Sequence, residues 1–299
     1  MPYVILGGAQ IAVGAAAIFA RWALGGADPL AVSAARLAIA AVLLLGAAIF
    51  MRAKAARKPT RRENVILSFG GLALAIHFST WIWSLEYTTV AISTLIVTST
   101  PIWTALYDML VLKRPLSRLA TLAFATGIVG MAMVVGFDTT APPVAGHQFL
   151  GAALAFVGSL AIGAYFILVR EVRGALGTRA IVTRTYSWAA LALVLAAAIA
   201  HQPPPPLHAT VAWSGILAMA LISQLLGHTA LNAALRWFSP SAIAFATLLE
   251  PVIAAILALV LFAEAVAPLS IVGGVILLAS IGVVLREDRM PGVRTEPAL

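Results

Sequence analysis

Hydrophobic residues run through this chain in long blocks, which short polar or glycine- and proline-containing segments separate. A helix that spans a bilayer needs about 20 predominantly apolar residues, and ten blocks meet this requirement. The connections between the blocks leave no room for a separate soluble domain. The predicted fold class is therefore an all-α, polytopic membrane protein, with ten transmembrane helices at residues 3–24, 29–51, 63–85, 88–112, 118–137, 148–169, 180–200, 209–235, 240–262 and 267–285.

Two of these blocks carry a proline beside polar residues. In the fourth block, Thr98, Pro101 and Asp108 fall along one side at helical spacing. Proline removes one intrahelical hydrogen bond, and within lipid the freed carbonyl needs another partner or a water-lined cavity. Glu250 and Pro251 repeat this pattern in the ninth block. We predict that these two broken helices meet in the middle of a transport protein.

The positions of lysine and arginine predict the orientation, because cytoplasmic loops carry an excess of both. With the N-terminus placed inside, the basic residues fall in the alternate, inner connections and in the C-terminal tail. Of the 19 basic residues, only Arg21 and Arg36 lie elsewhere. Both termini are therefore predicted to be cytoplasmic. The inner residues are Arg52, Lys54, Arg57, Lys58, Arg61, Arg62, Lys113, Arg114, Arg118, Arg170, Arg173, Arg179, Arg184, Arg236, Arg286, Arg289 and Arg294.

Composition narrows the class of protein further. The chain is 62% hydrophobic and 10% charged, whereas soluble domains carry about 25% charged residues. The formal charge of +8 follows from the inner loops, so we expect no nucleic-acid partner. No basic residues precede the first apolar block, which we interpret as a membrane helix rather than a cleaved signal peptide. The absence of cysteine excludes disulfides and thiol chemistry.

The two halves of the sequence resemble each other. Pro101 corresponds to Pro251 at an offset of 150 residues, and His77 corresponds to His228 at an offset of 151. Because each half holds five helices, an odd number, the second half must be inverted relative to the first, a recurring plan in secondary transporters. The predicted division is a first repeat at 1–140, a second repeat at 145–287 and a tail at 288–299.

Several short motifs resemble a known family. The chain resembles the drug/metabolite transporter superfamily, in particular its EamA-type members with two five-helix repeats. Its single-chain layout looks like the YddG-type amino-acid exporters. Lys113-Arg114 departs from this pattern, since such repeats often carry a glutamate at that point. The motifs that carry the resemblance are Ala35-Arg36-Leu37-Ala38, Pro101, Gly163-Ala164-Tyr165, Glu250-Pro251 and Glu264.

The resemblance implies a basket of helices around a central cavity, with the helix at 29–51 at its periphery and those at 118–137 and 267–285 outside it. It also implies alternating access and export of a small metabolite across the inner membrane. We expect a zwitterion, most directly an aromatic or neutral amino acid. The alternatives are export of lipophilic cations by the same fold and a membrane-embedded enzyme acting on lipid-linked substrates. The expected protein is not an enzyme and works as a monomer in the lipid bilayer.

Candidate cavity residues come from polar stripes at helical spacing. His77, Thr80 and Trp81 share one face of the third helix, and Trp81 can hold an ammonium group by cation–π attraction. Small polar groups also serve ordinary helix packing, so both interpretations stay open. The full set of cavity candidates is His77, Thr80, Trp81, Thr98, Thr100, Pro101, Gly163, Tyr165, Gln224, His228, Asn232, Glu250 and Pro251.

Four residues are candidates for gating or coupling, namely Gln10, Arg36, Asp108 and Glu250. Ionisable groups inside the membrane are costly and functional by default. Arg36 either contributes to substrate binding or a gate, or it is structural, with its long stem reaching the outer interface or its charge pairing with a helix end. Glu250 carries a proton, binds an ammonium group or packs beside the kink. Asp108 forms an inner gate or an interfacial ion pair, whereas the default for Gln10 is helix packing.

No motif in the sequence predicts a cofactor. The chain lacks a phosphate-binding G-x-x-x-x-G-K-[ST] loop and the zinc motif H-E-x-x-H. His77 and His228 have no acidic or thiol residues near them in the sequence. We therefore expect no metal, no cofactor and no direct use of ATP.

Overall fold

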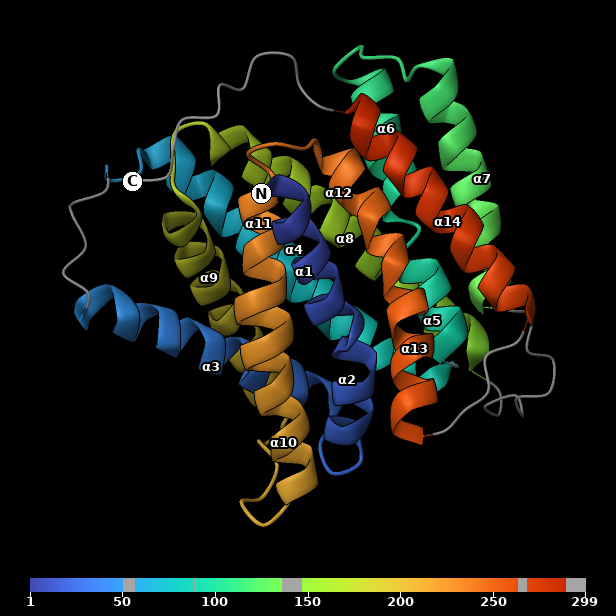
Figure 1. Cartoon of the computed structure of the whole chain (residues 1–299). Helices are drawn as coiled ribbons and strands as arrows, with labels where there is room; N and C mark the ends of the chain where they lie inside the picture. The colour runs from blue at the N-terminus through green and yellow to red at the C-terminus, as the bar shows by residue number, and fades with distance from the viewer. Residues whose placement is uncertain (51–56, 89, 136–146, 263–267, 289–299) are drawn as a thin grey trace.

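The computed structural model describes residues 1–50, 57–88, 90–135, 147–262 and 268–288, and these residues form helices and connections without a strand (Figure 1). Glu264, which carries part of the family resemblance, lies outside the described residues. The helices of the first half are α1 (Pro2–Gly14), α2 (Ala16–Leu24), α3 (Pro29–Phe50), α4 (Arg61–Tyr87), α5 (Val90–Val97), α6 (Thr100–Leu110) and α7 (Arg118–Val135).

The second half contains a π-helix, η1, and a 3₁₀ turn, η2, besides its α-helices. These elements interrupt two of the predicted membrane segments. Its elements are α8 (Gln148–Arg173), α9 (Thr178–Ile199), α10 (Thr210–Ala218), η1 (Met219–His228), α11 (Thr229–Ala234), α12 (Pro240–Ala246), η2 (Thr247–Leu249), α13 (Glu250–Phe262) and α14 (Pro268–Glu287).

Local sequence signals explain where several helices begin. The Thr60 side chain accepts a hydrogen bond from the Glu63 N–H, and Glu63 accepts one from the Thr60 N–H. This capping box satisfies two backbone donors and starts α4 two residues before the predicted apolar block. Ser239 caps α12 by accepting a bond from the Ala242 N–H at 3.1 Å.

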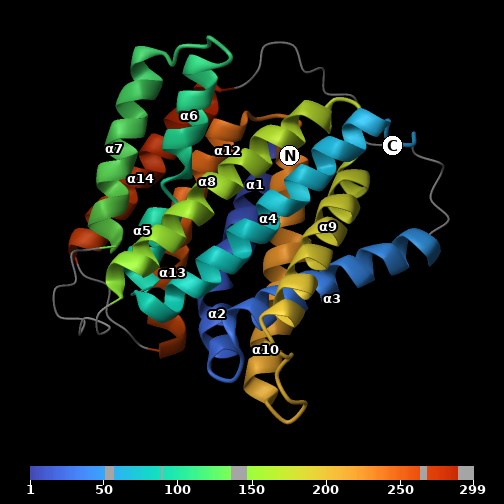
Figure 2. The ribbon, with the colours of Figure 1, turned by 180° about the vertical axis from the view of Figure 1, so that it is seen from behind.

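The helices pack into a bundle in which segments from both halves alternate. Helix α4 packs against α8 and α9, α7 packs against α14, and α1 packs against η1 and α13. Figure 2 shows α7 and α14 together on one side of the molecule and α3 with α9 on the other. Close approach depends on small residues: a Cβ at Gly71 would lie 2.4 Å from the Cβ of Trp188 and 2.8 Å from the carbonyl oxygen of Thr185.

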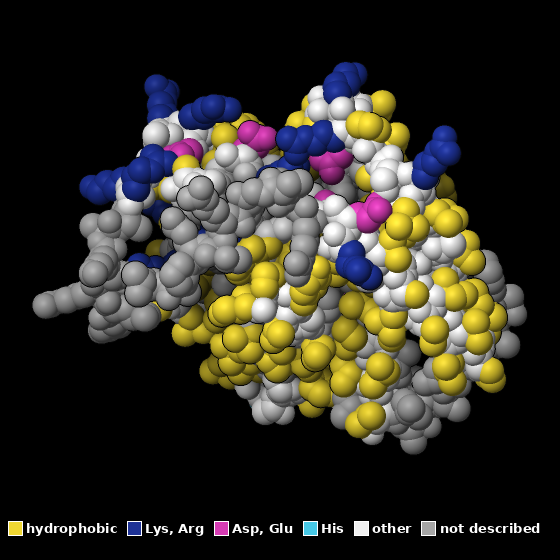
Figure 3. All heavy atoms as spheres, turned by 45° about the horizontal axis from the view of Figure 1, so that its top comes forward, with side chains coloured by type: hydrophobic (Ala, Val, Ile, Leu, Met, Phe, Trp, Pro, Cys, Tyr) yellow, Lys and Arg dark blue, Asp and Glu magenta, His cyan; other side chains and the backbone are white. Residues whose placement is uncertain are grey.

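The surface fits a membrane environment. Six described helical stretches are long and apolar enough to cross a bilayer, and shorter apolar helices cover Arg118–Met133 and Pro240–Ile253. Large hydrophobic side chains such as Phe69 and Leu72 are exposed on the outside of the bundle. In Figure 3, lysine and arginine side chains gather at one end, above a broad hydrophobic belt. The molecule is therefore a multi-pass membrane protein.

Candidate functional site

A narrow cavity lies inside the bundle where the interrupted helices meet. Its volume is about 30 Å³, and both halves of the chain contribute to its wall. No described residue of α7 or α14 lines it. The lining residues are Val13, Ala16, Arg36, His77, Phe78, Trp81, Val97, Thr98, Thr100, Ile162, Phe166, His228, Leu231, Thr247 and Glu250.

Arg36 brings a fully buried guanidinium group to this cavity from α3. Its Cζ lies 3.9 Å from the ring centroid of Phe78, within the range of a cation–π contact. Its Nη1 points at the Sδ of Met219 at 4.0 Å. Helix α3 therefore reaches the cavity, although the resemblance implies that this helix lies at the periphery.

Glu250 is the acidic residue that lines the cavity, and it comes from the other half of the chain. It begins α13, directly after the 3₁₀ turn η2, and the residue as a whole is partly buried. A carboxylate in the first turn of a helix is favoured by the helix dipole. Glu250 and Arg36 interact electrostatically across the cavity. The wall thus carries one cationic and one acidic group, from opposite halves.

The break between α5 and α6 supplies two hydroxyl groups to the wall. Pro101 has no N–H for the carbonyl of Val97, and the Thr100 hydroxyl donates to that carbonyl instead, at 2.8 Å. Thr98 likewise donates to the carbonyl of Thr94 at 2.6 Å. Ser159 of α8 adds a contact from another segment, because the Thr100 hydroxyl also lies 3.3 Å from the Ser159 carbonyl oxygen and 3.2 Å from its hydroxyl. Local bonds and this neighbour together satisfy the broken helix inside the membrane.

The second broken helix is satisfied in a related way. The Glu250 N–H donates to the carbonyl of Thr247, a bond of the 3₁₀ type that replaces the one Pro251 cannot make. The Thr247 hydroxyl donates to the carbonyl of Ala244 at 2.7 Å. The proline pattern in the sequence thus predicts both interruptions, and each lies beside the cavity.

Two histidines face the cavity at similar depth, one from each half. Nδ1 of His77 lies 2.9 Å from the carbonyl oxygen of Gly158, which can only accept a hydrogen bond. In a neutral ring Nδ1 therefore carries the hydrogen, and Nε2 is left as an acceptor. The His77 ring is nearly parallel to that of Trp81, with centroids 6.3 Å apart, and lies 6.5 Å from that of His228.

A layer of buried polar contacts lies behind the cavity wall. The Tyr165 hydroxyl donates to Oδ1 of Asn232 at 2.9 Å, and Asn232 donates to the carbonyl of His228 at 2.8 Å. The Tyr186 hydroxyl donates to the carbonyl of Gln224 at 3.4 Å. These residues support the π-helix from which His228 reaches the cavity.

The structure brings together some of the candidate residues and separates others. His77, Trp81, Thr98, Thr100, His228, Arg36 and Glu250 share the cavity wall. Gly163 lies beside α6: a Cβ added at Gly163 would lie 3.5 Å from the methyl group of Thr100 and 3.4 Å from that of Thr104. The candidates outside the wall are Gln10, Thr80, Pro101, Asp108, Gly163, Tyr165, Gln224, Asn232 and Pro251.

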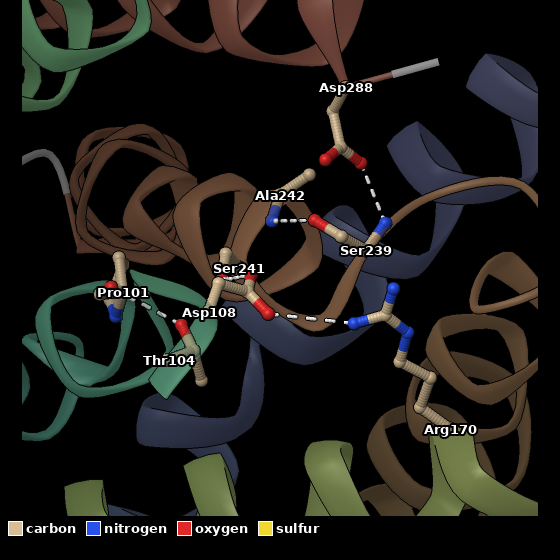
Figure 4. A network of polar contacts seen from close by, with 8 residues as sticks. All are labelled: Pro101, Thr104, Asp108, Arg170, Ser239, Ser241, Ala242 and Asp288. Carbon is tan, nitrogen blue, oxygen red and sulfur yellow. Dashed lines mark hydrogen bonds and ion pairs between the residues drawn. The ribbon is translucent and has the colours of Figure 1, made fainter. Parts of the chain in front are cut away.

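Asp108 belongs to a second polar cluster at the basic end of the bundle (Figure 4). Its Oδ2 accepts a hydrogen bond from the Ser241 hydroxyl at 2.5 Å, and its Oδ1 lies 3.5 Å from Nη1 of Arg170. Asp288 accepts a bond from the Ser239 N–H at 2.6 Å, and burial raises the pKa of its carboxyl. The cluster joins α6 of the first half to α8, α12 and the end of α14 in the second.

Some of the contacting residues could not be identified from the sequence. Phe78, Met219 and Ser241 lie in apolar stretches without a pattern that marks them as partners of a charged group. A signal does exist for Thr247, which precedes Glu250 by three residues and so shares its side of a helix. Long-range partners such as these appear only once the helices are packed.

The comparisons with known proteins agree with this arrangement. No curated protein sequence matches this chain. Chains of solved structures do match, and one, titled "Crystal structure of protein", is 14% identical with a TM-score of 0.76, covering 97% of this chain and 98% of that chain. At this identity the likeness concerns the fold alone. The model of the EamA-like transporter family matches residues 2–136 and 149–286, so the chain belongs to this family of the drug/metabolite transporter superfamily.

Proposed function

We propose that this protein is a secondary transporter that exports small zwitterionic metabolites, most directly aromatic or neutral amino acids, across the inner membrane. The observation that carries this proposal is a guanidinium group and a carboxyl group on the wall of one cavity. Arg36 comes from the first matched repeat and Glu250 from the second. A molecule with a carboxylate and an ammonium group complements both, while Trp81 and Phe166 offer an apolar surface for its side chain.

The proposed topology has ten membrane passes with both termini in the cytoplasm. This count is supported by the described helices, which follow the order of the predicted segments when the interrupted ones are joined end to end. The gathering of basic side chains at one end of the molecule supports placing that end inside (Figure 3). The cluster around Asp108 then lies on the cytoplasmic side of the cavity.

Alternating access is supported by the way the halves meet. The cavity wall draws on breaks in both repeats, at α5–α6 and at η2–α13, where the backbone lacks regular helical bonds. Ser241 of α12 donates a hydrogen bond to Asp108 of α6, so this contact joins the two repeats at the end that we place in the cytoplasm. A conformational change that separates α6 from α12 would open that end, because this contact is one that it must break.

Export of lipophilic cations is the competing function within the same fold. A cavity for cations needs acidic groups, and among the described lining residues Glu250 is balanced by the buried guanidinium of Arg36. The charge pattern therefore favours a zwitterion. A membrane-embedded enzyme would need acids, bases or metal ligands grouped at one point, and among the described residues no group of three His, Cys, Asp or Glu side chains could hold a metal.

A counterflow experiment tests the proposed function. Purified protein in liposomes loaded with unlabelled amino acid should accumulate the labelled form of a neutral or aromatic amino acid, at both pH 6 and pH 8. The Glu250→Gln variant keeps the size of the side chain but removes its charge, so we expect weaker uptake of amino acids. Lack of exchange for every amino acid, by protein that elutes as a folded species, would refute the substrate class.

A further inference from the structure

Among the described residues, one edge of the Arg36 guanidinium group has no hydrogen-bond partner. The face of the group lies on the Phe78 ring, and Nη1 contacts Met219. Among the described residues, neither Nε nor Nη2 has a hydrogen-bond partner, although the side chain is fully buried. Two of the three nitrogens are therefore held away from both water and protein acceptors.

The two unpartnered nitrogens are the pair that binds a carboxylate. The N–H groups of Nε and Nη2 point in the same direction, along the edge of the guanidinium farthest from Nη1. Arginine uses such an edge to hold both oxygens of a carboxylate through two parallel hydrogen bonds. A buried cation with unmet donors is costly, so a ligand that supplies two anionic oxygens gains the corresponding stabilisation on binding.

The protein has an acid in the cavity, yet this acid does not occupy the edge. Glu250 interacts electrostatically with Arg36, but among the described residues no acidic oxygen lies within 4.0 Å of the guanidinium. Arg36 lines the cavity, and the stacking on Phe78 fixes the plane of its guanidinium group.

We propose that Nε and Nη2 of Arg36 bind the free carboxylate of the transported molecule in a bidentate manner, while Glu250 receives its ammonium group. This assignment rests on the proposed export of zwitterions and adds the residues that select them. The carboxylate is then a requirement for binding. An amide of the same amino acid offers one neutral carbonyl oxygen in place of the two anionic oxygens, and the decarboxylated amine offers none. The substrate then bridges the two repeats.

Competition experiments test this assignment without altering the protein. Counterflow of labelled phenylalanine by the wild type is measured with L-phenylalanine, L-phenylalaninamide, phenethylamine or 3-phenylpropionate as competitor. We expect L-phenylalanine to compete at least tenfold more strongly than the amide and the amine. 3-Phenylpropionate should fall between them, because it keeps the contact with Arg36 but not that with Glu250. Equal competition by the amide and the acid would overturn the assignment.

Variants of Arg36 provide a second test of the proposed carboxylate contact. Arg36→Lys keeps the charge but not the two-pronged edge, so its half-saturating concentration for phenylalanine should rise about tenfold to a hundredfold. Arg21→Lys makes the same change at an exposed position on α2 and should leave transport unaltered. An unchanged half-saturating concentration in Arg36→Lys would refute the assignment while leaving amino-acid export intact.

Failure of the export proposal gives a different result. If the wild type exchanges no amino acid, the melting temperature of the purified protein is measured with 3-phenylpropionate and with phenethylamine. Stabilisation by the acid alone, lost in Arg36→Lys, would support the carboxylate site without amino-acid export. The absence of any shift with the acid would overturn the carboxylate site as well.

Discussion

Replacing Asp108 by alanine should open the cytoplasmic end of the proposed transport path. The carboxyl of Asp108 is buried and accepts a hydrogen bond from Ser241 at 2.5 Å, across the two repeats. A hydrogen bond to a charged group contributes about 1.5–3 kcal/mol. The more open ion pair with Arg170, at 3.5 Å, adds at most about 1 kcal/mol. Since about 1.4 kcal/mol is a factor of ten, the closed state should lose roughly tenfold to several hundredfold in population relative to the open state.

The chain contains no cysteine, which makes opening measurable with a single introduced thiol. Ala242 lines the pocket next to Asp108 and is 1% exposed, so Ala242→Cys reports on the closed interface. Its modification by a water-soluble thiol reagent should be at least tenfold faster in the Asp108→Ala background. Asp28→Ala, a matched change at an exposed position between α2 and α3, should have no effect. An unchanged rate in folded Asp108→Ala protein would refute the gating argument.

Three further predictions concern stability. Gly71→Ala should lower the free energy of unfolding by about 1–3 kcal/mol in a thermal melt, because the added Cβ meets backbone and Cβ atoms of α9. The control is Gly46→Ala, which has open space around it and should be neutral or stabilising. Tyr165→Phe should cost about 1–3 kcal/mol in the same melt, since it leaves Oδ1 of Asn232 without its donor. Burial raises the pKa of the Asp288 carboxyl above its ordinary value of 3.8. The contribution of this group to stability is therefore greatest below pH 3.8 and falls as the pH rises through the raised pKa. Asp288→Asn should melt at a higher temperature than the wild type near pH 7, and this difference should vanish below about pH 4.

The helical fold could be predicted from the apolar blocks, because a helix satisfies its backbone hydrogen bonds within the segment and can expose apolar side chains to lipid. The interruptions at Pro101 and Pro251 could also be predicted, since proline has no N–H to donate the backbone hydrogen bond of a helix. The break at Ala15 carries no proline. The sequence contains no marker for it, and packing against neighbouring helices decides its place.

The candidate site was predictable only where helical spacing holds. Gln224, His228 and Asn232 are expected on one stripe of a regular helix. The structure forms a π-helix at Met219–His228, whose i→i+5 bonds change the angular spacing of the side chains. His228 faces the cavity, while Asn232 contacts Tyr165 behind the wall. No pattern in the sequence predicts this change from an α-helix to a π-helix.

The placement of the two charged groups gives the proposed cycle its energetic link. A ligand shifts a conformational equilibrium only by its difference in affinity between the states. A zwitterion held by Arg36 and Glu250 binds best when the two repeats are close, because each repeat supplies one of its two charges. An unliganded cavity leaves the Arg36 edge unpaired and so gains less from closure. The contacts of Asp108 are worth about as much as one hydrogen bond to a charged group, whereas the proposed substrate makes several such contacts, so its binding can shift the equilibrium against the contact of Asp108.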